Sequence, residues 1–456
     1  MNEPNSTKLI RQYDVPTPRY TSYPTVPEWD TNIFSSAEWF KTVSRAFTES
    51  NDSKGISVYI HLPFCESLCT YCACNTRITK NHLRELPYIQ SLLKEWDTYL
   101  KVFGRKPLLR ELQLGGGTPT FFGAENLKWL VSYLLEDVNI HEDREFSFEG
   151  HPNNTSKDHL QALYDLGFDR VSFGVQDLDM KVQETINRVQ PFENLEQACM
   201  TARSIGYSSI NFDLIYGLPF QTPFTVSDTF DRILELHPDR LAFYSYAHVP
   251  WLRPGQRGYS EKDLPSSFLK RHLYDLGKHK LRNAGYADIG MDHFALRKDD
   301  LFKAYVAGKL HRNFMGYTTS QTDLVIGLGA SSISDSGYAY AQNLKGVEEY
   351  TEAIKNHGVA LGKGHILNDE DIDTRKCILQ LSCTGKLDQE LMDQVVDSVI
   401  LDNLVRMEKE GLIYLFDQGG LRVTSVGEPF IRNICNVFDK RQRYTASNSQ
   451  MFSKAI

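Results

Sequence analysis

The chain has 456 residues, and its 50 Lys and Arg against 58 Asp and Glu give a formal net charge of −8. A hydrophobic fraction of 41% and a charged fraction of 24% are typical of a globular protein of two or three domains, and they exclude collagen-like and wholly disordered chains. The negative charge argues against a protein whose main partner is nucleic acid.

The N-terminal segment, residues 1–54, shows weak periodicity and many turn-forming residues. We therefore expect an extended arm. The first residues are polar, and no stretch of the chain approaches the run of about 18 apolar residues that a membrane span needs. These features predict a cytoplasmic protein with no membrane partner.

Residues 55–308 alternate between β-rich runs and amphipathic stretches. Six strand and helix pairs predict an α/β fold with a parallel sheet, because each strand must return through a crossover helix. The predicted strands are 56–64, 109–114, 145–149, 170–176, 210–216 and 240–247, and the predicted helices are 83–103, 124–136, 157–166, 193–205, 226–236 and 266–284.

The alternation fades near residue 309, and we predict a smaller, mostly helical C-terminal domain over residues 309–456. Its expected elements are helices over 371–382 and 388–410 and a hairpin over 411–423.

Four of the eight cysteines, at positions 65, 69, 72 and 74, directly follow the first predicted strand. Cys65, Cys69 and Cys72 have the spacing C-x3-C-x2-C, which allows three thiolates on one loop to hold a cubane iron–sulfur cluster. Three ligands would leave one iron open to a substrate. The alternative is a closed zinc site that uses all four thiols.

Polar residues or glycines stand where the following predicted strands end. The second strand runs into Gly115-Gly116-Gly117, where backbone N–H groups can approach a ligand closely. Glu149, Gln176, Asp213 and Ala247 lie near the ends of the next four strands. The carboxyl ends of parallel strands in a barrel surround one mouth, so these residues are expected to ring a single site.

The cysteine spacing, with Tyr71 before the third cysteine, resembles the radical S-adenosylmethionine superfamily. Within it, Cys74 and the segments 18–25, 211–219, 290–295, 313–319 and 431–435 resemble the family of oxygen-independent coproporphyrinogen III oxidases. This resemblance covers almost the whole chain. It implies a partial (β/α)6 radical-SAM barrel over residues 55–308, with the arm and the C-terminal domain closing over its mouth.

The resemblance also implies the cofactor sites. Cys65, Cys69 and Cys72 would hold a 4Fe-4S cluster, and Cys74 would lie near it without being a ligand, since a fourth thiolate would close the open iron. A first S-adenosylmethionine would contact Tyr59, Gly116, Glu149 and Ile333. A second would contact Tyr71, Gly117, Thr118, Gln176, Arg188, Asp213 and Ala247.

The activity implied by the resemblance is the anaerobic oxidative decarboxylation of two propionates of coproporphyrinogen III to vinyl groups, through a 5'-deoxyadenosyl radical. The product is protoporphyrinogen IX, an intermediate of haem biosynthesis. An electron donor such as flavodoxin or ferredoxin and a monomeric state are further implications. Arg19 and Arg312 are candidate cations for the carboxylates of the substrate.

Two other functions fit parts of the pattern. The related haem-binding chaperones share the barrel and the cluster motif, but residues 18–25 and Cys74 favour the oxidase. A radical enzyme that modifies RNA would be expected to carry a basic module, and none is apparent in the sequence. Two positions, His151 and Met315, depart from the oxidase pattern.

Overall fold

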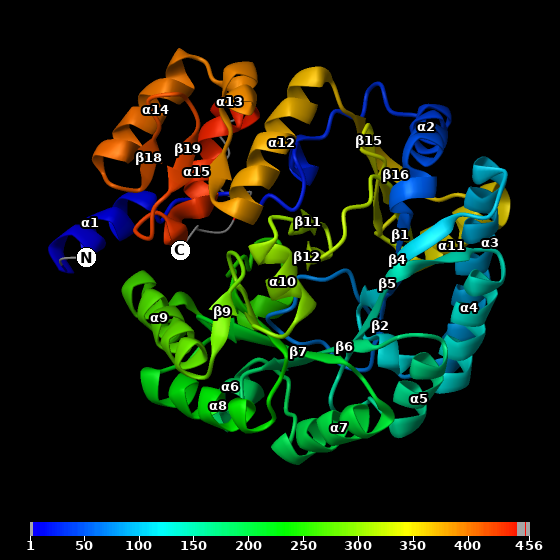
Figure 1. Cartoon of the computed structure of the whole chain (residues 1–456). Helices are drawn as coiled ribbons and strands as arrows, with labels where there is room; N and C mark the ends of the chain where they lie inside the picture. The colour runs from blue at the N-terminus through cyan, green and yellow to red at the C-terminus, as the bar shows by residue number, and fades with distance from the viewer. Residues whose placement is uncertain (1–2, 445–451, 453–456) are drawn as a thin grey trace.

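The computed structural model describes residues 3–444 and residue 452, and one large curved sheet dominates it (Figure 1). Twelve of the described strands form this sheet in the order β16-β15-β14-β13-β1-β4-β5-β6-β7-β8-β10-β9. Its central six strands are parallel, as the sequence predicts. They are β1 (Ile56–Leu62), β4 (Leu108–Gly116), β5 (Asn139–Gly150), β6 (Arg170–Gln176), β7 (Ser209–Tyr216) and β8 (Arg240–Ser245).

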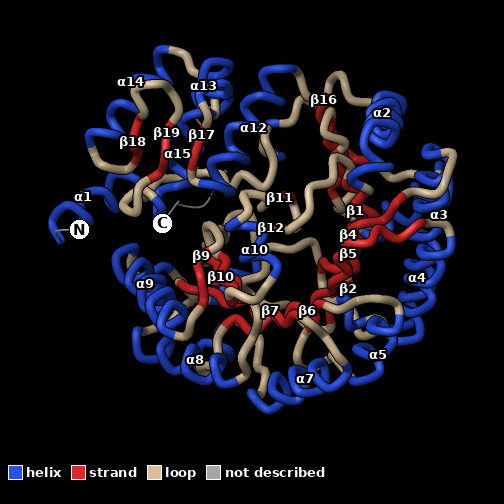
Figure 2. The backbone as a smooth tube through the Cα atoms, viewed as in Figure 1, coloured by secondary structure: helices blue, strands red, loops and turns tan. Residues whose placement is uncertain are grey.

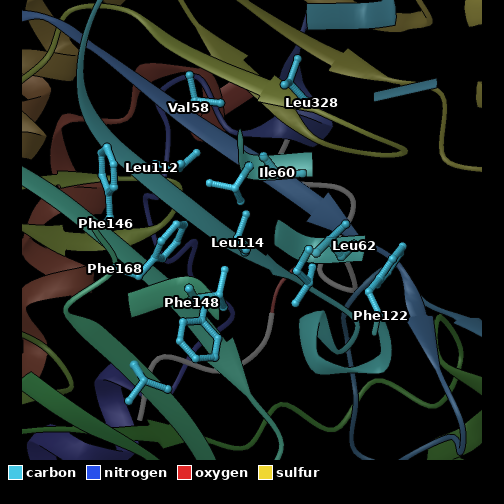
Figure 3. Close-up of a cluster of buried hydrophobic side chains, with 14 of the residues drawn as sticks. Val58, Ile60, Leu62, Leu112, Leu114, Phe122, Phe146, Phe148, Phe168 and Leu328 are labelled. Atoms are coloured by element: carbon cyan, nitrogen blue, oxygen red, sulfur yellow. The ribbon is translucent and has the colours of Figure 1, made fainter. Parts of the chain in front are cut away.

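Crossover helices cover the outer face of these strands, which confirms the predicted α/β architecture (Figure 2). Between this layer and the strands lie fully buried apolar side chains such as Ile60, Leu112 and Phe146, drawn in Figure 3. Burial of this apolar area drives the association of helix and sheet. The helices are α3 (Glu85–Phe103), α4 (Ala124–Glu136), α5 (Lys157–Asp165), α7 (Phe192–Ile205), α8 (Pro223–Glu235) and α9 (Ser267–Asn283).

The sheet continues on both sides of the six parallel strands. On one side β13 (Val325–Leu328) pairs parallel to β1, and three antiparallel strands follow it. The sheet thus includes residues beyond 308. The division of the chain into domains at residues 54 and 308 stays a prediction. The added strands are β14 (Ile333–Asp335), β15 (Ala339–Asn343) and β16 (Leu361–Ile366), with β10 (His293–Leu296) and β9 (Tyr286–Asp288) at the opposite edge.

The first 54 residues contain two helices, so the prediction of an extended arm is wrong for these parts. Helix α1 (Glu3–Tyr13) buries Leu9, Ile10 and Tyr13 in the C-terminal core, and α2 (Ser36–Lys54) buries Trp39 and Val43 against the sheet. Both helices gain their stability from these distant contacts, which local periodicity does not reveal. Residues 14–35 between them are mostly irregular, with one short 3-10 turn at Val26–Glu28.

The C-terminal residues pack around a separate apolar core that includes Ile378, Leu404 and Ile434. The predicted helix 388–410 is two helices, because Val396 is extended and the Asp397 side chain caps the second one. The predicted hairpin is present as β18 and β19. The elements are α12 (Asp369–Thr384), β17 (Lys386–Leu387), α13 (Gln389–Val395), α14 (Ser398–Lys409), β18 (Ile413–Leu415), β19 (Leu421–Val423), α15 (Ile431–Phe438) and α16 (Lys440–Tyr444).

Short elements connect these units. They are β2 (Phe64–Cys65), β3 (Arg77–Ile78), α6 (Met180–Thr185), α10 (Asp300–Val306), β11 (His311–Asn313), β12 (Gly316–Thr318) and α11 (Val347–His357). None of the helices in residues 3–444 combines the length and the apolar character required to cross a bilayer.

Candidate active site

The cysteine loop follows β1 at the carboxyl edge of the parallel sheet. Its start is fixed by β2, which pairs with β3 beyond the loop. Its middle is fixed by the turn after α6: Thr70 N donates to Ile186 O at 2.9 Å, and the Asn187 side-chain amide donates to Leu68 O at 2.8 Å. The side chains of Cys65, Cys69 and Cys72 are partly exposed and that of Cys74 is exposed.

A second contact to this loop comes from the residues after β8. The Gln256 side chain is fully buried, and its Nε2 lies 3.3 Å from Tyr71 O and 3.2 Å from Ala247 O. Arg253 also donates to Ala73 O. Gln256 therefore joins two residues that the sequence predicts at one ligand. The sequence does not predict Gln256, because it lies in a short 3-10 helix, Pro254–Gly258, without a recognisable motif.

The glycine run at the end of β4 allows a close approach between this strand end and the cysteine loop. A Cβ on Gly117 would lie 2.6 Å from Pro63 O and 3.0 Å from Cys65 Sγ. A Cβ on Gly116, whose φ is +118°, would lie 2.9 Å from the His61 ring. At position 117 any side chain larger than hydrogen would clash with the cysteine loop, while the approach of backbone N–H groups to a ligand stays a prediction.

The thiols of the loop have polar neighbours. Cys65 Sγ lies 3.3 Å from Thr118 Oγ1, and Arg188 Nη1 lies 3.6 Å from Cys69 Sγ. The neighbouring Cys74 thiol lowers the pKa of Cys72, whereas burial raises the pKa of Cys65 to about 11. Hydroxyl and guanidinium donors beside sulfur stabilise thiolates, the form in which cysteine binds iron.

The arrangement of these thiols fits an iron–sulfur cluster better than a single zinc ion. In the described part of the chain, no three Cys, His, Asp or Glu side chains converge on a point where one metal ion could sit. A closed zinc site needs four donors at about 2.0–2.3 Å from one centre. A cubane instead takes its thiolates at separate corners. The sulfurs of Cys65, Cys69 and Cys72 lie along one loop, and the Arg188 guanidinium donates to that of Cys69. This arrangement is suited to a cubane cluster.

The residues predicted at the first S-adenosylmethionine lie on neighbouring strands. Gly116 N donates to Glu149 Oε2 at 3.3 Å, and a Cβ on Gly115 would touch both Glu149 and Tyr59. Tyr59 pairs across to Gly327 on β13, and a Cβ on Gly327 would lie 2.6 Å from Ile333 O. Burial, followed by the charge of Asp213, raises the pKa of Glu149 to about 7.

Most residues predicted at the second S-adenosylmethionine lie near the ends of β6 to β8 and on the cysteine loop. Gln176 Nε2 and Arg188 Nη2 both lie within 2.8 Å of where a Cβ on Gly174 would be, and Arg188 Nη2 donates to Gly174 O. Asp213 accepts from Ser172 Oγ at 2.8 Å and from Asn211 Nδ2 at 2.9 Å. The structure thus provides carboxylate and guanidinium groups suited to an amino-acid or ribose ligand.

The two predicted substrate cations have different environments. Arg19 is half-buried, and its Nη2 donates to Ser245 O at the end of β8. Arg312 is buried, and its Nη1 donates to the backbone oxygens of Arg19 and Tyr20 at 2.9 and 2.7 Å. Arg312 therefore fixes the backbone that carries Arg19. Of the two departures from the family pattern, His151 N–H lies 3.4 Å from Thr120 Oγ1, and Met315 lines a small cavity beside Glu111.

Comparisons with known proteins identify the family of the chain. Residues 59–233 match the family model of the radical SAM superfamily. The chain is 39% identical to an oxygen-independent coproporphyrinogen III oxidase of Pseudomonas aeruginosa and 37% identical to one of Escherichia coli, in each case over 98% of both chains. The solved structure of coproporphyrinogen III oxidase from Escherichia coli, described as a radical SAM enzyme, superimposes with a TM-score of 0.87 at 36% identity, covering 95% of this chain and 98% of the other.

Proposed function

The chain belongs to the family of oxygen-independent coproporphyrinogen III oxidases within the radical SAM superfamily, and from this membership we infer the reaction at the barrel mouth. The enzyme decarboxylates two propionates of coproporphyrinogen III oxidatively to vinyl groups without oxygen. The product is protoporphyrinogen IX, and the reaction serves porphyrin and haem biosynthesis. Its cofactors are a 4Fe-4S cluster and S-adenosylmethionine.

One observation supports this assignment of residues most directly: Arg188 donates both to Cys69 Sγ and to Gly174 O at one edge of the sheet. We propose Cys65, Cys69 and Cys72 as the ligands of the cluster. Cys74 stays a neighbour that lowers the pKa of Cys72. Three protein ligands leave one iron for S-adenosylmethionine.

The strand ends supply two groups of contacts for that cosubstrate. Tyr59, Gly116, Glu149 and Ile333 are proposed for the molecule at the cluster. Tyr71, Gly117, Thr118, Gln176, Arg188, Asp213 and Ala247 are proposed for a second molecule. When bound, the reduced cluster and S-adenosylmethionine would supply the radical chemistry that removes a hydrogen atom from the β-carbon of a propionate.

The chain's own residues bind, orient and shield. Glu149 and Asp213 are buried carboxyl groups that can accept hydrogen bonds from ribose hydroxyls or an ammonium group. Arg188 presents a guanidinium that can pair with a carboxylate. Residues 17–20 pack against Arg312 and Arg432 beside the end of β8, and we propose that they cover the mouth and exclude water from the radical.

Further features of the enzyme are proposals of the same kind. We propose a monomer in the cytoplasm that takes its electrons from a flavodoxin or ferredoxin, with an arm, a barrel and a C-terminal domain divided near residues 54 and 308. Four buried free cysteines, Cys199, Cys377, Cys383 and Cys435, suit a reducing compartment.

The test is an anaerobic assay of the iron-reconstituted, reduced protein with S-adenosylmethionine and coproporphyrinogen III. We expect protoporphyrinogen IX and 5'-deoxyadenosine, both dependent on S-adenosylmethionine. Stable haem binding with no cleavage of S-adenosylmethionine by a protein with an intact cluster would contradict the proposal and favour a haem-binding chaperone.

A further inference from the structure

A cavity of about 270 Å³ lies between the barrel and the C-terminal core. On the barrel side it is lined by Tyr216 at the end of β7, by Ser245 at the end of β8 and by three residues of α9. Residues 381–386 and Arg422 of β19 line the C-terminal side. None of these lining residues is among those that the sequence assigns to the cluster or to S-adenosylmethionine.

The lining carries more positive than negative charge. Its cations are Arg19, Arg271, Lys278, Lys386, Arg422 and Arg432, and its carboxylates are Asp288, Asp292 and Glu428. Lys278 pairs with Asp288 at 3.0 Å and with Glu428 at 3.6 Å, and Arg271 pairs with Asp275 outside the lining.

The other cations leave positive charge facing the cavity. Among the described residues, Arg19, Lys386 and Arg422 have no carboxylate within salt-bridge distance. Arg432 is buried and donates to the backbone oxygens of Thr17 and Pro18. Burial, with the charges of Arg19 and Arg312, lowers the pKa of Arg432 to about 10. A concave surface with such a charge excess favours an anionic ligand.

The cavity adjoins the carboxyl edge of the sheet where the predicted cosubstrate residues lie. Tyr216 lies three residues after Asp213 on β7, and Ser245 precedes Ala247 by two residues. Between the two regions stands Tyr244, whose ring centroid is 6.0 Å from the Arg19 guanidinium carbon. Burial and the carboxylates of Asp213 and Asp292 raise the pKa of Tyr244, while Arg19 lowers it. Arg19 of the cavity and Asp213 of the predicted cosubstrate site are thus both close enough to Tyr244 to shift its pKa.

We propose that this cavity is a carboxylate subsite, which holds propionate arms of the porphyrinogen while another propionate lies at the radical. The inference rests on the proposed function, because it takes its ligand from the substrate of that reaction. Coproporphyrinogen III has four propionates and only two react, so a site for non-reacting carboxylates fixes which arm reaches the barrel mouth. Arginine pairs with carboxylates in a two-pronged geometry, which orients the ligand as well as binding it.

The binding test uses the reconstituted protein under anaerobic conditions and the fluorescent, oxidised tetracarboxylate coproporphyrin III. Its tetramethyl ester serves as the uncharged probe. The variants are Arg422→Gln, which changes an exposed side chain, and the double variant Arg19→Gln with Arg422→Gln. Lys128→Gln on α4 is the matched control, since this exposed lysine lies far along the chain from every lining residue.

We expect the double variant to weaken binding of coproporphyrin III about tenfold, as for the loss of charge-assisted hydrogen bonds. The KM for coproporphyrinogen III should rise in parallel, while kcat changes less. The single variant should show a smaller change in the same direction, and the control none. The ester should bind weakly to every form, and inorganic phosphate should compete only at high concentration.

Equal affinity of the wild type and both cavity variants, or equal binding of acid and ester, would overturn the subsite. Competition by phosphate as strong as by the porphyrin would identify a general anion site and also overturn it. Charge-dependent porphyrin binding by a wild type that forms no protoporphyrinogen IX would instead overturn the proposed function and leave the carboxylate site standing.

Discussion

Arg188 and Cys69 are in direct contact, although 119 positions separate them in the sequence. The Arg188 Nη1 atom donates to Cys69 Sγ at 3.6 Å, and Nη2 of the same guanidinium donates to Gly174 O at 2.7 Å. One side chain therefore connects a sulfur of the cluster loop to β6. A positive charge and a hydrogen bond beside a ligand sulfur favour the reduced, more negative form of an iron–sulfur cluster.

Replacing Arg188 by Gln should lower the reduction potential of the cluster and slow cleavage of S-adenosylmethionine by roughly 10- to 100-fold. Iron content should stay near that of the wild type, because the three cysteines remain. A redox titration followed by electron paramagnetic resonance measures the potential. Arg257→Gln, which changes an exposed arginine of the nearby loop, is the control. An unchanged potential in the Arg188 variant would contradict this role.

Cys74 should be dispensable for cluster assembly. Its side chain is exposed and neighbours Cys72, so Cys74→Ser keeps a small polar group at this position. We expect reconstituted Cys74→Ser to bind about as much iron as the wild type, and Cys72→Ser to lose most of it. Iron and sulfide analysis with the visible absorption spectrum makes the comparison. Equal loss in both variants would show that Cys74 is a ligand.

Gly117→Ala should disturb the cluster loop. The added Cβ would meet Pro63 O at 2.6 Å and Cys65 Sγ at 3.0 Å, and the first of these is a backbone atom that cannot rotate away. Overpacking of this kind costs about 1–3 kcal/mol. We expect a lower thermal midpoint and a lower iron content after reconstitution. Gly258→Ala is the matched control, because a Cβ there has open space. Wild-type iron binding by the Gly117 variant would refute the close approach.

Glu95 predicts a pH dependence of stability that is independent of the active site. It is buried on α3 and accepts hydrogen bonds from Tyr350 Oη at 2.6 Å, Gly329 N at 2.9 Å and Asn343 Nδ2 at 2.6 Å. Burial still raises its pKa from 4.5 to about 7. Between these values Glu95 holds a proton in the folded protein that it has released in the unfolded chain, so Glu95 contributes a fall in the free energy of unfolding as pH rises from 4.5 to about 7.

Glu95→Gln removes this titration and should flatten the fall by up to about 1.4 kcal/mol for each unit of pKa difference. Denaturant unfolding of the holoenzyme at several pH values between 4.5 and 7.5 measures the slope. Glu196→Gln, at an exposed position of α7, should keep the wild-type slope. A slope in the Glu95 variant as steep as in the wild type would mean that another group is responsible.

The sequence was sufficient for the part of the fold that carries the site. The strand predicted at 170–176 coincides with β6, because the alternation of apolar and polar residues between turn residues is visible locally. Strands β13 to β16 were not predicted; β13 and β14 are short, and β13 is defined by its pairing with β1. Helix α1 was missed because the surface that covers Leu9 and Tyr13 lies in the C-terminal core.

The same distinction applies to the site. Cys65, Cys69 and Cys72 could be predicted from spacing on one loop, and Glu149 and Asp213 from their places near strand ends. Gln256 and Arg422 could not be predicted. The roles proposed for them depend on residues far along the chain that they contact or face only after folding. Motifs reveal chemistry that one segment supplies, whereas contacts between segments require the folded chain.

The most direct test of the account follows the hydrogen atom that leaves the substrate. Coproporphyrinogen III carrying deuterium at the β-carbons of its propionates is incubated anaerobically with the reduced holoenzyme and S-adenosylmethionine, and the 5'-deoxyadenosine is analysed by mass spectrometry. The account predicts that deuterium from the substrate appears in 5'-deoxyadenosine together with protoporphyrinogen IX. Protoporphyrinogen IX formed with no deuterium in 5'-deoxyadenosine would contradict it.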